Sequence, residues 1–345
     1  MSSQKMKINM PQWVAGIIRS KDVAAIPVMT HPGIEMIGHT VREAVSDGRI
    51  HAEAVIALAK KFPSAAACTI MDLTVEAEAF GALVVFSDDA VPAVSGRLLN
   101  SIEDIECLQV PSLHAGRVPQ YLKANLLAAK SISQMGKGSG ERPLFAGCIG
   151  PFSLAGRLYD MAEMMMLIYE QPQAAHALLS KCAQFITKYC QALKLTGSNG
   201  VLMAEPAAGL LSDDDCRTFS SQYVRKVVEE VQDESFIVIL HNCGNTGHCT
   251  KAMVSTGAAA YHFGNKCNME EVIRDVPPTA LAMGNLDPVS LFKDGTPEQM
   301  RRAVHALLDK MRPFPNFVLS SGCDTPPHTP QANIEAFFSA LVDRS

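Results

Sequence analysis

Short apolar runs alternate along this chain with longer segments in which apolar residues recur every three or four positions. A short run bounded by turn residues is typical of a buried strand, whereas the longer spacing predicts an amphipathic helix. The predicted strands are Ile26–Met29, Ala66–Met71, Leu83–Phe86, Leu144–Cys148, Gly200–Ala204, Phe236–Leu240, Ala258–Phe263, Ala280–Met283 and Asn316–Ser320. The clearest predicted helices are Gln173–Leu195, Asp213–Gln232, Pro297–Met311 and Pro330–Val342.

This alternation predicts an α/β fold in which helices cover a parallel sheet. About eight strand–helix units in one chain favour a closed (β/α)8 TIM barrel over an open doubly wound sheet. The chain also lacks a G-x-G-x-x-G segment after an early strand, which weakens a dinucleotide-binding interpretation. Helix-start signals agree with the pattern, since Ser212 precedes three aspartates and Thr296 precedes Pro297.

The first third of the chain is less regular. Helical runs at Pro11–Arg19 and Ile50–Lys61 predict an N-terminal helical extension, comprising residues 1–65, that caps the mouth of the barrel. We expect residues 1–345 to form a single barrel domain, because barrels of this size often stand as one unit. The glycine-containing stretch Lys137–Glu141 has the composition of a linker.

Composition narrows the classes of function. The net charge of −5 and the lack of a Lys/Arg-rich run predict no nucleic-acid partner. The apolar runs are far shorter than a membrane span and residues 1–10 carry no apolar signal segment, so we expect a cytoplasmic protein without a membrane partner. In that compartment the ten cysteines are expected to be thiols, some of which serve as metal ligands or nucleophiles.

The most informative segment is the end of the predicted strand Phe236–Leu240, which continues as His241-Asn-Cys243-Gly. Residues two apart on a strand point the same way, so His241 and Cys243 can face one metal ion. The last predicted strand ends in Gly-Cys323, and the carboxyl ends of barrel strands form one rim where active sites lie. One imidazole and two thiolates are a zinc ligand set, and three protein ligands leave a fourth position for a substrate.

Four nearby residues are alternative ligands: His248, Cys249, Cys267 and His262. His248 and Cys249 are predicted to lie inside the following helix, where a structural role is expected. His262 sits on a later predicted strand, from which it would support a metal ligand or face the substrate.

Three further polar residues at predicted strand ends are candidates for cofactor binding: Glu205, Asn285 and Asp287. Glu205 would be a fourth metal ligand that substrate displaces, or would orient a ligand; a charge on a surface loop is the structural alternative. Asn285 and Asp287 would line the pocket, and capping the next helix is their alternative role.

The His241-x-Cys243-Gly-Asn-Thr segment with the distant Gly-Cys323 resembles the zinc motif of the corrinoid-dependent methyltransferases in the uroporphyrinogen decarboxylase superfamily. Residues 147–156 resemble the glycine-proline-phenylalanine loop of these enzymes, and residues 284–288 followed by 295–298 are similar to their late barrel signature. The resemblance covers nearly the whole chain. Residues 27–34 depart from the arginine-rich motif with which true uroporphyrinogen decarboxylases hold substrate carboxylates, which argues against porphyrinogen decarboxylation.

The resemblance implies an enzyme of one-carbon metabolism, such as methanogenesis, in which His241, Cys243 and Cys323 are the metal-binding and catalytic residues. It would be a zinc-dependent methyltransferase that moves a methyl group from methylcobalamin or a methylated corrinoid protein to a thiol such as coenzyme M, or to another small acceptor. The alternatives are a decarboxylase-like lyase, a tetrahydrofolate-linked methyltransferase of the same fold, and a noncatalytic corrinoid-binding protein. A homodimer is expected by analogy with the superfamily.

Overall fold

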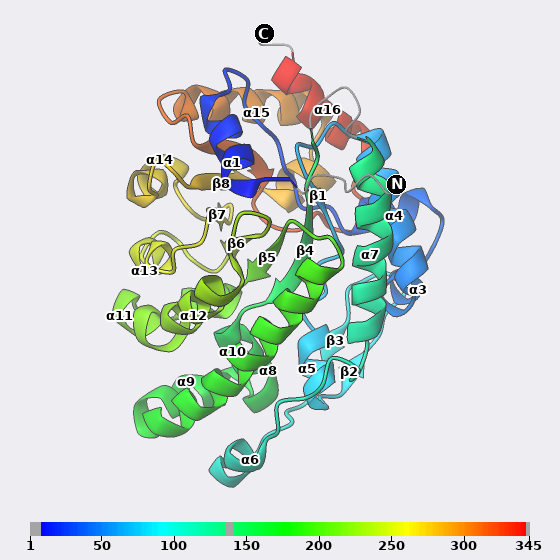
Figure 1. Ribbon diagram of the computed structural model, residues 1–345. Coiled ribbons are helices and arrows are strands. Elements are labelled where there is room, and N and C mark those ends of the chain that lie inside the picture. The colour runs from blue at the N-terminus through cyan, green and yellow to red at the C-terminus, as the bar shows by residue number, and fades with distance from the viewer. Residues whose placement is uncertain (1–7, 136–140, 343–345) are drawn as a thin grey trace.

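The computed structural model describes residues 8–135 and 141–342, and its central feature is a parallel sheet (Figure 1). Seven strands lie side by side in the order β1-β4-β5-β6-β7-β8-β9. Their order in the sheet is therefore the same as their order in the chain. Their bounds are β1 Ala67–Cys68, β4 Leu144–Ile149, β5 Gly200–Ala204, β6 Ile237–Asn242, β7 Ala260–Phe263, β8 Leu281–Leu286 and β9 Phe317–Ser321. The predicted α/β class with a parallel sheet is confirmed.

A stretch of extended backbone, residues 24–28, lies between the two edge strands of this sheet. On one side Ile26 N–H donates to the carbonyl of Leu319 in β9, and Leu319 N–H donates to the carbonyl of Ala24, both at 2.9 Å. On the other side Ala65 N–H, just before β1, donates to the carbonyl of Ala25 at 2.9 Å. The sheet is therefore curled in a TIM-barrel-like way, and in place of the predicted strand at 26–29 the structure has this segment, with one isolated bridge between Ala25 and Leu319.

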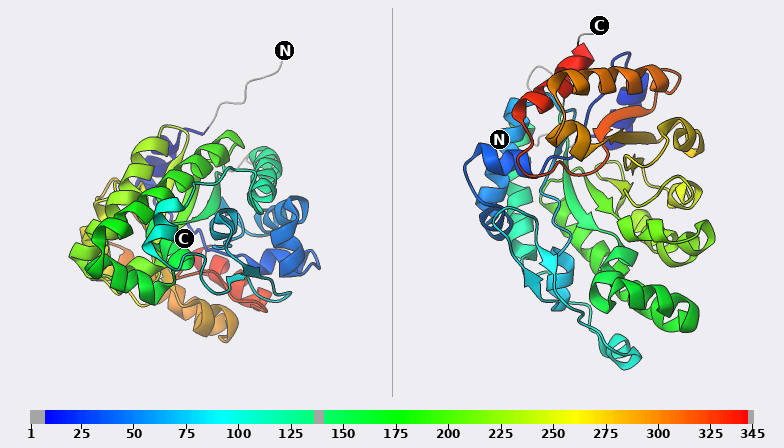
Figure 2. Two further views of the ribbon diagram at one scale, coloured as in Figure 1. Left: turned by 90° about the horizontal axis from the view of Figure 1, so that it is seen from below. Right: turned by 180° about the vertical axis from the view of Figure 1, so that it is seen from behind.

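Helices cover the outside of the sheet, as two further views show (Figure 2). Those before β4 are α1 Met10–Arg19, α2 His31–Met36, α3 Val41–Ser46, α4 Gly48–Lys61, α5 Val75–Phe80, α6 Ile102–Cys107 and α7 Val118–Met135. Those after β4 are α8 Pro151–Tyr159, α9 Met161–Glu170, α10 Pro172–Leu195, α11 Asp213–Cys216, α12 Gln222–Val231, α13 Thr250–Val254, α14 Met269–Val272, α15 Pro297–Met311 and α16 Gln331–Val342. Short 3-10 or π turns complete the set: η1 Pro206–Leu210, η2 Arg217–Ser221, η3 Ile273–Asp275 and η4 Pro288–Lys293.

The predicted helix starts are confirmed by their caps. The Ser212 side chain accepts a hydrogen bond from Asp215 N–H at the start of α11. At α15, Thr296 and Gln299 form a reciprocal capping box, which satisfies backbone N–H groups that have no partner inside the helix.

Alternate residues of the strands fill the interior of the curled sheet with apolar side chains. Because side chains on a strand alternate between its two faces, every second residue points inward. The inward-facing residues of β6 are Ile237 and Ile239, and the same interior cluster contains Ala260 of β7 and Val318 of β9. The next inward positions, toward the carboxyl ends of the strands, are therefore His241, His262 and Ser320.

Helix α1 closes the opposite end of this interior. Met10 and Val14 belong to the interior cluster, and the Trp13 ring lies 5.8 Å from that of Phe145 near the start of β4. Met10 N–H also donates to the carbonyl of Glu234, which precedes β6. The expectation that this part of the N-terminal extension covers the mouth is wrong, because its apolar face seals the amino ends of the strands.

The predicted strand Leu83–Phe86 does not join the parallel sheet. Within it, β2 (Val84–Val85) pairs antiparallel with β3 (Ala93–Val94) in a separate ribbon. The physical reason is the short connection, because parallel pairing needs a crossover of about a dozen residues or more. Leu83 and Val85 are 68% and 55% exposed, as suits a surface ribbon.

Two remaining expectations concern linkers and membranes. The predicted linker Lys137–Glu141 lies, except for Glu141, outside the described residues. Among the helices of residues 8–135 and 141–342, none combines the length and apolar character that a membrane crossing requires.

Candidate metal centre

The three predicted zinc ligands lie at the carboxyl ends of β6 and β9. Strand β6 is buried along its whole length, and His241 takes the inward position that follows Ile239. Cys243, two residues further, follows the same alternation. Cys323 lies two residues beyond the end of β9, whose neighbours are β8 and the bridging segment 24–28.

The structure brings the predicted ligand atoms together. A ring nitrogen of His241 and the Sγ atoms of Cys243 and Cys323 all lie within 4.8 Å of one another. Cys323 Sγ is 3.9 Å from His241 Nε2. In a tetrahedral zinc site, bond lengths of about 2.3 Å for Zn–S and 2.1 Å for Zn–N place sulfur and nitrogen about 3.5 Å apart. These side chains therefore fit a zinc ion after small movements.

The two thiols of this group shift each other's pKa in opposite directions. A hydrogen bond from Cys323 lowers the pKa of Cys243 to about 7, with help from the Cys243 backbone N–H and Lys266 and against the effect of burial. The same contact, together with burial, raises the pKa of Cys323. One thiolate is thus favoured near neutral pH, and a divalent cation would replace the remaining proton because it stabilises both sulfur atoms as thiolates.

A second imidazole contacts His241. His241 is 5% exposed, and its Nδ1 lies 2.7 Å from Nδ1 of His262, its partner in register on β7. His262 Nε2 lies 2.7 Å from Ser320 Oγ. Burial, and secondarily the neighbouring His241, lower the pKa of His262 well below its usual value. The sequence pattern identified His262 as a candidate but not Ser320. The feature that could have identified Ser320 is its polar side chain at an inward position of an otherwise apolar strand.

The other alternative ligands contact backbone carbonyl groups instead. His248 Nε2 lies 3.0 Å from the carbonyl oxygen of Leu211, and Cys249 Sγ donates to the same oxygen at 3.2 Å. Cys267 Sγ donates to the carbonyl of Asn245 at 2.8 Å. The prediction that His248 and Cys249 lie inside a helix is wrong, since both precede α13 in a turn.

Glu205 caps a helix. Its side chain is buried, and its carboxylate accepts from the N–H groups of Phe152 at 2.7 Å and Ser153 at 2.9 Å, in the first turn of α8. The Ser220 hydroxyl donates to the same carboxylate at 3.0 Å. Because Ala204 faces the interior, Glu205 faces outward toward α8, where the helix dipole favours an anion. The structure therefore gives Glu205 neither the ligand position nor the exposed loop position considered from sequence.

Asn285 and Asp287 both make structural contacts at the end of β8. Asn285 Nδ2 donates to the carbonyls of Gly264 and Cys267, at 3.0 and 2.8 Å, and so holds the loop after β7. Asp287 Oδ1 accepts from the first two backbone N–H groups after Pro288, at 2.8 and 3.0 Å, and caps η4. A role in cofactor binding stays a prediction for both residues.

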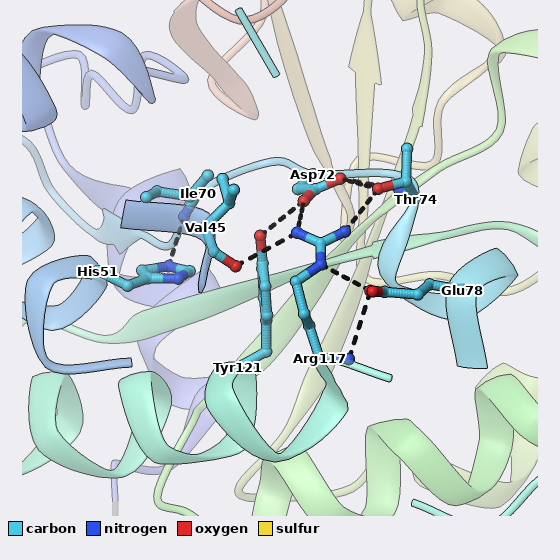
Figure 3. Close-up of polar contacts among 8 residues, drawn as sticks. All are labelled: Val45, His51, Ile70, Asp72, Thr74, Glu78, Arg117 and Tyr121. Atoms are coloured by element: carbon cyan, nitrogen blue, oxygen red, sulfur yellow. Dashed lines mark hydrogen bonds and ion pairs between the residues drawn. The ribbon is translucent and has the colours of Figure 1, made fainter. Parts of the chain in front are cut away.

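A second buried polar cluster lies after β1 (Figure 3). The Arg117 guanidinium donates to Asp72 Oδ2 at 2.5 Å, to Glu78 Oε2 at 2.6 Å and to Thr74 Oγ1 at 2.7 Å. The Tyr121 hydroxyl also donates to Asp72, at 2.9 Å. Local sequence patterns missed this cluster because Arg117 lies 45 residues from its main partner. With its charges paired, the cluster joins α5 and α7 to the segment that follows β1.

Comparisons with known proteins agree with this architecture. The family model of uroporphyrinogen decarboxylase (URO-D) matches residues 15–343. The methylcobamide:CoM methyltransferase MtbA of Methanosarcina acetivorans is 30% identical over 267 residues, which are 76% of this chain and 75% of the relative. The uroporphyrinogen decarboxylase of Alcanivorax borkumensis is 25% identical over 296 residues, 83% of this chain and 81% of the relative.

A solved methyltransferase structure from Methanosarcina mazei superposes with a TM-score of 0.86, covering 99% of each chain at 21% sequence identity, which shows a shared fold. The family match and the MtbA relative fit the motifs at the ends of β6 and β9. The chain belongs to the uroporphyrinogen decarboxylase family and resembles its methylcobamide:CoM methyltransferase branch.

Proposed function

We propose that this protein is a zinc-dependent methyltransferase that moves a methyl group from a methylcorrinoid to a thiol such as coenzyme M. The observation that carries the proposal is the convergence of His241, Cys243 and Cys323 at one end of the curled sheet, with their ligand atoms within 4.8 Å of one another. The MtbA relative, named for a methylcobamide donor and a CoM acceptor, supports the choice of substrates.

The residues suit this chemistry. Zinc, when bound, would supply the Lewis acidity that keeps an acceptor thiol deprotonated near neutral pH. His241, Cys243 and Cys323 would occupy three ligand positions and leave the fourth for the acceptor. The acceptor sulfur would then bond to the methyl carbon as the cobalt–carbon bond of the donor breaks, and the electron pair of that bond would leave with the demethylated corrinoid.

Two alternatives on the same fold are weaker. Uroporphyrinogen decarboxylases are also relatives, but residues 27–34 of this chain contain no arginine to bind substrate carboxylates. A tetrahydrofolate-linked methyltransferase would use the same ligands with another substrate. Neither alternative has an observation in the structure that favours it over a thiol acceptor.

Several broader expectations belong to the same proposal. We treat the chain as a single domain whose segment 24–28 completes a closed (β/α)8 barrel, with a corrinoid protein as methyl donor. Asn285 and Asp287 are proposed to line the site from the end of β8. A homodimer, by analogy with the family, and a cytoplasmic location complete the proposal.

The test combines metal analysis with an optical assay. We expect the purified protein to contain about one zinc per chain and to remove the methyl–cobalt absorbance of methylcobalamin when coenzyme M is present. Cys323→Ser should lose both properties, since it removes a ligand. Cys107→Ser is the matched control, because this thiol is exposed and lies on α6.

Three results would contradict the proposal. The first is full zinc content in Cys323→Ser, which would remove this residue from the site. The second is loss of absorbance that does not depend on the thiol. The third is turnover of uroporphyrinogen by the metal-free protein, which would favour the decarboxylase.

A further inference from the structure

Three polar side chains form one layer across the interior of the curled sheet. They are His241 on β6, His262 on β7 and Ser320 on β9, and they are 5%, 0% and 0% exposed. The layer lies next to the apolar interior cluster, on the side of the carboxyl ends of the strands. In each strand the residue two positions earlier belongs to the apolar interior cluster, namely Ile239, Ala260 and Val318. The layer is therefore shielded from water on the side that faces the amino ends of the strands, and each of its polar atoms needs a hydrogen-bond partner in the protein.

The donor and acceptor of each hydrogen bond in this layer can be assigned by starting from Ser320. The Ser320 hydroxyl lies 2.7 Å from the carbonyl oxygen of Ile26, which can only accept, so the hydroxyl donates there. Its oxygen then accepts from His262 Nε2, 2.7 Å away. His262 thus carries a proton on Nε2. His262 is fully buried beside the apolar interior, where an unpaired cation would be costly, so its Nδ1 holds the lone pair.

The assignment continues to the metal site. His262 Nδ1 lies 2.7 Å from His241 Nδ1, and two lone pairs cannot face each other at that distance, so His241 donates from Nδ1. In the neutral tautomer that this hydrogen bond selects, the lone pair is on Nε2. This is the nitrogen that lies 3.9 Å from Cys323 Sγ.

We infer that His262 and Ser320 are positioning residues that hold the proton of His241 on Nδ1 and keep its Nε2 lone pair directed at the metal. The inference rests on the proposed zinc site. Which ring nitrogen of a histidine binds metal is set by the hydrogen bond of the other nitrogen. His262 is not itself a ligand, because both of its nitrogens are already engaged.

A pair of shape-matched variants tests the inference. Asparagine and leucine have side chains of similar size and branching, but only asparagine can place an acceptor oxygen near the position of His262 Nδ1. We expect zinc affinity, measured by competition with a chromophoric chelator, to fall on the order of 10–100-fold in His262→Leu. His262→Asn should stay within about threefold of the native protein, since it keeps the acceptor.

A second readout needs no metal and no activity. Nitrogen-15 NMR of histidine-labelled, reduced, metal-free protein shows which ring nitrogen of His241 carries the proton. We expect Nδ1–H in the native protein and in His262→Asn, and a mixture or Nε2–H in His262→Leu. Ser320→Ala should weaken zinc binding in the same direction, because it removes the acceptor for His262 Nε2.

The inference is overturned if native His241 carries its proton on Nε2, or if His262→Leu and His262→Asn bind zinc equally well. The native NMR measurement decides the point even if His262→Leu does not fold. A native protein that binds no zinc, yet shows Nδ1–H on His241, would defeat the proposed function and leave the hydrogen-bonded layer established.

Discussion

Replacing Arg117 by methionine should destabilise the protein by several kcal/mol, although Arg117 lies outside the proposed metal centre. The change keeps most of the apolar stem and removes the guanidinium that pairs with Asp72 and Glu78. The Asp72 side chain is 0% exposed and the Arg117 side chain is 8% exposed. Water therefore cannot replace the lost cation beside Asp72.

The size of this loss of stability depends on the hydrogen-bond donors that the Asp72 carboxylate keeps. Removing one partner of a buried ion pair costs about 3–5 kcal/mol, because the other charge stays buried. Asp72 would keep three donors: Thr74 N–H at 2.9 Å, the Thr74 hydroxyl at 2.7 Å and the Tyr121 hydroxyl at 2.9 Å. Glu78 is 22% exposed and can be hydrated. We therefore expect the lower end of the range, about 3 kcal/mol.

Urea unfolding followed by far-UV circular dichroism measures this change in the free energy of unfolding. The matched control is Arg42→Met, which breaks an ion pair with Asp88 whose side chains are 55% and 61% exposed. That control should cost no more than about 1 kcal/mol. Adding Asp72→Asn to Arg117→Met should recover part of the loss, because it removes the stranded charge. A cost for Arg117→Met equal to that of the control would refute the reasoning.

Two further predictions concern buried carboxylates. Glu205→Ala should lower the free energy of unfolding by about 2–4 kcal/mol, because two N–H groups of α8 lose their acceptor; zinc content should not change, and a zinc-free variant would contradict the helix-cap role. Glu76 is 0% exposed, its Oε2 has no hydrogen-bond partner among the described residues, and burial raises its pKa to about 8. A carboxyl group with a raised pKa stabilises the folded state at low pH, and this stabilisation is lost as pH rises through the pKa of the folded state. Glu76→Gln should therefore gain stability relative to the native protein between pH 5 and 8, by at most about 5 kcal/mol. Urea titrations at both pH values measure the difference, and a gain independent of pH would count against the assignment.

Much of the candidate site followed from local sequence signals. His241 and Cys243 share a face because the strand repeat is two residues, and the buried run before them identified the strand. Cys323 required the further assumption that the last strand ends at the same rim, which the parallel order of β6 to β9 bears out. Helix α15 begins and ends where its cap and spacing predicted.

The remaining features depend on contacts between distant parts of the chain. Glu205 follows β5 at a strand end, as expected, but only the packing of α8 against it turns its carboxylate into a helix cap. Helix α1 was predicted correctly as a helix and placed at the wrong end, because amphipathicity says which face is buried and not what covers it.

The sequence alone determined the alternation of strands and helices, the family, and the candidate metal ligands His241, Cys243 and Cys323, because these depend on spacing along a few residues. The tertiary structure decided the rest: the approach of Cys323 to His241, the pairing of His241 with His262 and Ser320, and the burial of Arg117 beside Asp72. Each of those contacts joins residues that are separate in the chain. Their distances are fixed only when the whole sheet curls and brings its strand ends together.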